Sequence, residues 1–106
     1  MVRTPEQRWE PIAKNQLAKR GVTAGTGFGT NAGLRVSGKI FAMLDSKGRF
    51  VVKVPRIRAD ALLARGQAVH FEPVPGRPMK EWLVVTGRRP SWLALAREAY
   101  EYVASL

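Results

Sequence analysis

Hydrophobic side chains recur at helical spacing near both ends of the chain, and they alternate with polar ones in much of the middle. Residues 4–7, TPEQ, form a capping-box pattern with proline at the first helical position. One apolar helix face follows, made by Trp9, Ile12, Ala13 and Leu17. Ser91 caps a last helix, whose inward positions are Trp92, Leu93, Ala96, Tyr100 and Val103. A shorter helix is predicted over residues 57–65, where Gly66 ends it.

Short alternating segments predict β-strands that are separated by glycine and proline turns. They cover residues 34–37, 39–45, 49–54, 68–74 and 81–86. The second and third of these strands form a hairpin, whereas residues 21–33 hold five glycines and are predicted to be a loop. The predicted order is α-β-β-β-α-β-β-α. It describes an α+β fold in which helices pack on a mostly antiparallel sheet of about five strands.

The length and composition fit one globular domain over residues 1–106, because 45% of the residues are hydrophobic and 25% are charged. The sequence has no cysteine, which excludes disulfides, Cys-ligated zinc and iron–sulfur clusters. The longest unbroken apolar runs, at 40–44 and 92–96, are five residues each. Such runs are too short for a transmembrane helix or a signal peptide. We therefore expect a cytoplasmic protein without a membrane partner.

The net charge of +10 changes this picture, because a basic excess favours polyanions such as nucleic acid, acidic proteins or anionic membranes. The excess is uneven: residues 1–20 carry +3, residues 21–58 carry +6 and residues 59–106 carry +1. A polyanion site is therefore predicted in the middle third. The alternative is a solvated basic surface without function, since 12 of the 18 basic residues are arginine, as in proteins from GC-rich genomes.

Two phosphate-binding patterns occur and both lack the required context. Residues 33–39 match the first seven positions of a P-loop, but Ile40 stands where serine or threonine is needed, and the match runs from strand to strand. Residues 27–32 match G-x-G-x-x-A, but they follow a helix and lead into a strand instead of the reverse. Neither pattern predicts a nucleotide site.

Candidate catalytic chemistry is limited to His70, the single histidine, and Glu72 two residues later. Two such groups do not make a zinc site, which takes three or four protein ligands. An edge histidine at the surface is the better interpretation, so no catalytic residue, metal or cofactor is predicted.

The three tryptophans, Trp9, Trp82 and Trp92, occupy apolar positions of their elements and are predicted to be core residues and not platforms for bases. Phe28, within the glycine-rich segment, is the aromatic side chain expected to be exposed.

The predicted hairpin is the most informative segment for binding. Alternation gives residues 49–54 one apolar face, Phe50, Val52 and Val54, and one mixed face, Arg49, Val51 and Lys53. On the preceding strand the same rule places Lys39, Phe41 and Met43 on the mixed face, opposite Ile40, Ala42 and Leu44. The predicted nucleic-acid-binding residues, on this hairpin and next to it, are Arg35, Lys39, Arg49, Lys53, Arg56 and Arg58. The alternative is an amphipathic hairpin whose charges protect a sheet edge from aggregation.

Four segments together resemble the N-terminal domain of the TfoX/Sxy proteins, whose general plan the MmcQ/YjbR proteins share. They are GFGTNAGLRVSGKIFAML (27–44), GRFVVKVPRIRADALLARG (48–66), FEPVPGRPMKEWLVV (71–85) and WLALAREAYEYV (92–103). The resemblance implies an antiparallel sheet with flanking helices, a regulatory or DNA-binding role, and no catalytic residues. Longer TfoX/Sxy proteins carry a second, C-terminal helical domain without a counterpart up to Leu106, so competence regulation is not expected.

The sequence thus predicts a small non-enzymatic domain that binds nucleic acid weakly and with little sequence preference, through Lys and Arg contacts to phosphates. The alternative is a protein-interaction or accessory module, with an acidic protein partner or as a homodimer. A third role, in small-molecule binding or catalysis, depends only on His70, Glu72 and residues 21–33.

Overall fold

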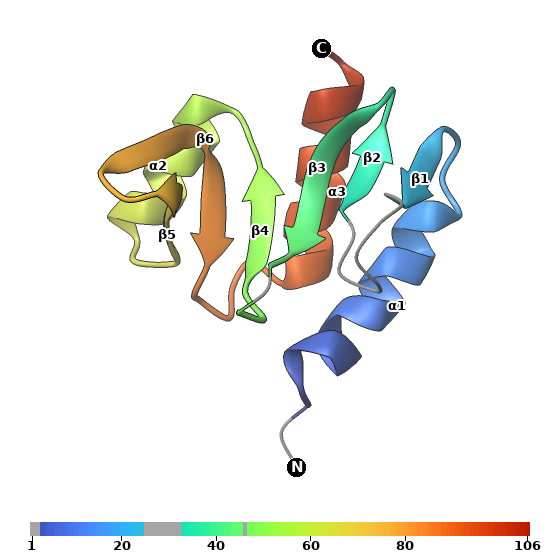
Figure 1. The fold of residues 1–106 in the computed structure, drawn as a ribbon, viewed down its shortest axis with the longest axis horizontal. Helices are drawn as coiled ribbons and strands as arrows, with labels where there is room; N and C mark the ends of the chain where they lie inside the picture. The colour runs from blue at the N-terminus through green and yellow to red at the C-terminus, as the bar shows by residue number, and fades with distance from the viewer. Residues whose placement is uncertain (1–2, 25–32, 46) are drawn as a thin grey trace.

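The computed structural model describes residues 3–24, 33–45 and 47–106. The elements within these ranges are α1 (Pro5–Leu17), β1 (Val22–Ala24), β2 (Leu34–Val36), β3 (Lys39–Leu44), β4 (Phe50–Lys53), α2 (Arg56–Ala64), β5 (Ala68–Val74), β6 (Arg77–Val85) and α3 (Trp92–Ala104). The α+β prediction is confirmed (Figure 1). β1 is an additional strand inside the predicted glycine-rich loop, and its three residues are too few to show alternation.

A single antiparallel sheet holds all six strands in the order β1-β2-β3-β4-β6-β5. β2 and β3 meet in a tight turn in which Ser37 and Gly38 both have positive φ angles, 53° and 77°. Two central residues with positive φ are what a two-residue type I′ hairpin requires. Residues 33–39 therefore run from strand to strand, which confirms that they do not form a P-loop. The G-x-G-x-x-A match and Phe28 lie outside the described residues.

Side-chain caps begin the first and last helices where the sequence predicted them. The Thr4 hydroxyl accepts a hydrogen bond from the Gln7 backbone N–H at 3.1 Å, and the Thr4 N–H donates to the Gln7 side chain at 3.0 Å. At α3, the Ser91 hydroxyl accepts from the Ala94 N–H at 3.1 Å. Each cap satisfies helix donors that would otherwise lack a partner.

All three helices pack on one side of the sheet, which we call the covered face. The ring of Phe50 stacks on Trp92 with a centroid distance of 4.7 Å and lies 5.9 Å from the ring of Trp9. α2 adds Ala59 and Leu62 to the same core. The predicted core positions of Trp9 and Trp92 are confirmed, because these side chains are 3% and 8% exposed.

A β-bulge in β3 reverses the alternation that the sequence predicted. Leu34 of β2 lies opposite Ala42, and Arg35 lies opposite Ile40, so Phe41 is an extra residue. Its side chain is fully buried, and its ring packs in a T-shaped arrangement with Tyr100 of α3, with 5.6 Å between the ring centroids. The prediction that Lys39 and Phe41 share the mixed face is therefore wrong: Lys39 pairs with the buried Val36, and Ile40 pairs with Arg35 on the other side of the sheet.

The opposite side of the sheet, the open face, carries no helix among the residues that the structure describes; Figure 1 looks onto it, with α2 and α3 behind the strands. Register and alternation place on it Met43, Val51, Lys53, Val69, Trp82 and Val84. Phe71 joins them, since its ring centroid lies 6.5 Å from that of Trp82. Trp82 is only partly buried and lies outside the main core, so its predicted core position is wrong.

Candidate nucleic-acid interface

The six predicted binding residues do not form one patch. Lys53 and Arg56 lie together where β4 ends and α2 begins. Lys39 is exposed at the same end of the sheet, because β3 and β4 run antiparallel with Ala42 opposite Val52. Arg35 lies two strands away on the open face, about 10 Å from β4 at the usual strand spacing.

The cationic side chains that do converge line a shallow hollow of about 440 Å³, which we call the Trp82 hollow. Its lining residues are Lys53, Arg56, Lys80, Glu81 and Trp82. Lys53 pairs with Trp82 across β4 and β6, and Lys80, two residues before Trp82 on β6, lines the same hollow. Arg56 follows at the first residue of α2, because Pro55 ends the strand and occupies the N-cap position.

The acidic member of this hollow is held by α3. The Tyr102 hydroxyl donates a hydrogen bond to Oε2 of Glu81. This hydrogen bond, then burial, then the negative charge of Glu81 raise the pKa of Tyr102 above its ordinary value of 10.0. The hollow combines three cations with this one carboxylate and keeps a positive balance.

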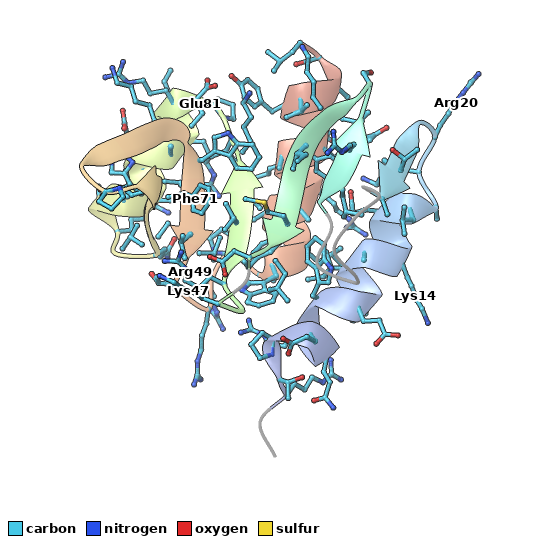
Figure 2. All side chains as sticks on the ribbon, viewed as in Figure 1. Lys14, Arg20, Lys47, Arg49, Phe71 and Glu81 are labelled. Atoms are coloured by element: carbon cyan, nitrogen blue, oxygen red, sulfur yellow. The ribbon has the colours of Figure 1, made fainter. Side chains whose placement is uncertain are left out.

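Arg49 lies at the other end of β4, about 13 Å from Lys53 along the strand. Its Nε forms an ion pair with Oδ2 of Asp45 at 2.7 Å, and its backbone N–H donates to Oδ1 at 2.8 Å. Burial raises the pKa of Asp45, but hydrogen bonds from Arg49 and from the Lys47 backbone outweigh it, so this pKa lies below its ordinary value of 3.8. Figure 2 shows Arg49 and Lys47 at the lower end of the sheet, and Glu81 at the upper end. The charge of Arg49 is therefore offset within its own turn.

Arg58 lies on the helix side of the molecule, away from the open face. Its guanidinium donates to both carboxylate oxygens of Glu98 on α3, at 2.8 and 3.2 Å. With Glu98, Glu101, Pro55 and Tyr102 it lines a separate hollow of about 380 Å³ that holds two carboxylates and one cation. The net negative charge of this hollow disfavours phosphate binding. Arg58 therefore does not extend the basic surface around Lys53.

The fold does not support the third role suggested by the sequence, small-molecule binding or catalysis at His70 and Glu72. His70 and Glu72 are both exposed on β5, an edge strand, which confirms the interpretation of His70 as an edge residue. Among the residues of the described ranges, no group of three or more His, Asp or Glu side chains is placed to hold a metal ion. Across these same ranges, no helix is long and apolar enough to cross a membrane.

Sequence reasoning missed three members of the Trp82 hollow: Lys80, Glu81 and Trp82 itself. Residues 82–85, WLVV, are apolar at every position, so alternation does not show which side of β6 faces the helices. The available signal was Lys53: its cross-strand neighbour had to lie on the same mixed face, and that neighbour is Trp82.

The fold and this hollow define the class of the protein: a small α+β domain with a half-covered antiparallel sheet and a basic, aromatic hollow at one end. The sequence model of the YjbR family matches residues 17–102, which is most of the chain, and the chain belongs to that family. No curated protein and no solved structure matches the chain.

Proposed function

We propose that this YjbR-family domain is a non-enzymatic protein that binds nucleic acid with little sequence preference, at the Trp82 hollow. The observation that carries the proposal is the convergence of Lys53, Arg56 and Lys80 around a partly exposed aromatic ring. Lys and Arg side chains contact phosphates without regard to sequence, and such contacts supply most of the affinity of non-specific binding. The resemblance to the TfoX/Sxy N-terminal domain supports a regulatory role in the cytoplasm.

The charge distribution favours this end of the sheet over the other predicted cations. Arg49 and Arg58 are each held by a carboxylate at 2.7 and 2.8 Å. A phosphate there would have to compete with Asp45 or Glu98. At the Trp82 hollow the single carboxylate, Glu81, accepts a hydrogen bond from Tyr102, and no ion pair of Glu81 occurs among the described side chains. The hollow therefore presents its positive charge to an incoming anion.

A titration of duplex DNA, single-stranded DNA, RNA and heparin at several salt concentrations tests the proposal. Three phosphate contacts should give a log–log salt slope of about −2.7 on duplex DNA and about −2.1 on single strands. The double variant Arg56→Glu/Lys80→Glu changes two exposed residues of the hollow and should weaken binding at least roughly tenfold.

The matched control is Lys14→Glu/Arg20→Glu, which reverses two exposed cations on and just after α1. Figure 2 shows both residues at the α1 side of the molecule. Each double variant lowers the net charge by the same amount, so a difference between them reports location alone. Equal losses would show diffuse attraction without a site. Absence of binding by the unaltered protein near physiological salt would overturn the proposal, and gel filtration of that protein would then test the protein-interaction alternative.

A further inference from the structure

The open face brings two aromatic rings to the edge of the basic hollow. Trp82 and Phe71, on adjacent strands β6 and β5, have ring centroids 6.5 Å apart and an interplanar angle of 53°. Both side chains are partly exposed, in contrast to Trp9 and Trp92 on the covered face. Figure 2 shows Phe71 on the side of the sheet that faces the viewer. Adjacent, partly exposed aromatic rings are typical of binding surfaces.

The charges around these rings match a phosphate backbone. Lys53 pairs directly with Trp82 across β4 and β6, and Lys80 and Arg56 line the same hollow. Aromatic platforms interleaved with cations are how proteins bind unpaired strands, since bases stack on the rings while phosphates lie along the basic groove. The occupant that fits both features is therefore a single-stranded nucleic acid.

The spacing of the rings also disfavours a duplex. Successive nucleotides of a B-form strand rise about 3.4 Å, roughly half the separation of the two centroids, and the tilted rings do not present parallel faces. A duplex also keeps the faces of its bases stacked on each other, so only the base edges are accessible to side chains. Only an unpaired, extended strand can place one base on each ring.

We propose that Trp82 and Phe71 stack unpaired bases, so that the Trp82 hollow prefers single-stranded over duplex nucleic acid. This inference rests on the proposed function, because the cations of the hollow supply the phosphate contacts. It adds a preference that cations alone cannot produce. DNA and RNA strands share the stacking chemistry, and the two are compared as separate arms of the test.

The test compares the binding affinities of wild type, Trp82→Leu and Trp82→Phe. The ligands are a single strand of about 12 nucleotides, made as DNA and as RNA, and the matching DNA duplex. This length lies within the range that single-strand binding sites span. Trp82→Leu loses the stacking of one base, so it should bind both single strands roughly tenfold more weakly, with an unchanged salt slope. Trp82→Phe keeps most of the affinity because it keeps a ring. Duplex binding stays the same in all three proteins.

A second measurement changes the ligand and leaves the protein intact. An abasic strand of equal length keeps the phosphates and lacks the bases, so wild type should bind it more weakly than Trp82→Leu binds the normal strand, because both rings then lose their partners. Equal affinity of wild type for the abasic and normal strands would overturn stacking while leaving the proposed function in place. Lack of binding to every strand and duplex would instead remove the proposed function itself.

Discussion

The two faces of the sheet have similar apolar centres and different surroundings. On the covered face, Trp92 of α3 lies 8% exposed against Phe50, and Trp9 and Arg8 of α1 pack against these two rings. On the open face, Trp82 is partly exposed beside Lys53 and Phe71. The comparison shows that strand hydrophobicity alone does not say which face becomes the core. Position relative to the amphipathic helices decides this, and on the other face Trp82 and Phe71 stay partly exposed.

The largest expected difference between the faces is in the stability of two tryptophan variants. Trp92→Ala removes a ring stacked on Phe50 inside the core and should lower the free energy of unfolding by about 3–5 kcal/mol. Trp82→Ala should cost less than about 2 kcal/mol, because its ring is already partly hydrated. Urea unfolding followed by circular dichroism measures both values. Equal losses of stability in the two variants would mean that Trp82 is packed as tightly as Trp92.

A closer comparison uses two adjacent valines. Val51 and Val52 are both 0% exposed, but Val52 belongs to the main core, whereas Val51 lies opposite Met43 on the open face. Val52→Ala should cost about 2–3 kcal/mol, because the helices hold the resulting cavity open. Val51→Ala should cost about 1 kcal/mol, since flexible neighbours such as Met43 can close over the gap. The same unfolding experiment checks the order, and a larger loss for Val51 contradicts it.

Much of this fold could be predicted from the sequence because its signals are local. The cap residues Thr4 and Ser91 mark where α1 and α3 begin, and both make the expected hydrogen bonds. Alternation in β4 assigned Phe50 and Val52 to the core correctly. β1 and the bulge at Phe41 were missed, since both depend on pairing with β2. Pairing is a tertiary property that a strand's own residues do not encode.

The candidate site was harder to predict because charge partners are distant in sequence. Arg58 meets Glu98, 40 positions away, and this ion pair removes Arg58 from the predicted basic surface. Lys53 and Arg56 were found because they are near each other in the chain. Lys80 and Trp82 join them only through the pairing of β4 with β6. A list of basic residues therefore includes some members of the Trp82 hollow and omits others.

Asp45, in the turn between β3 and β4, should make the stability of the fold depend on pH. The pKa of Asp45 lies below its ordinary value of 3.8, so its ionised form stabilises the fold above that pH, and the stabilisation is lost as the pH falls through the lowered pKa. Asp45→Asn should cost about 1 kcal/mol at pH 7. The difference from wild type should disappear in strongly acidic solution, as urea unfolding at a series of pH values would show. A difference independent of pH would assign the effect to geometry alone.

The smallest expected effect separates a cation of the covered side from one of the open face. The Arg58–Glu98 ion pair is about one-third exposed, with side-chain exposures of 31% and 38%. A double-mutant cycle with Arg58→Ala and Glu98→Ala should therefore give a coupling energy of only about 0.5–1 kcal/mol, and high salt should reduce it.

Because Arg58 faces α3, Arg58→Ala should leave the affinity for a single strand within roughly twofold of wild type. Lys53→Ala should reverse the pattern, with a clear loss of affinity and a lower salt slope, because one phosphate contact is removed. If Arg58→Ala weakens binding as much as Lys53→Ala, the binding surface extends around the molecule and the two sides are not functionally distinct.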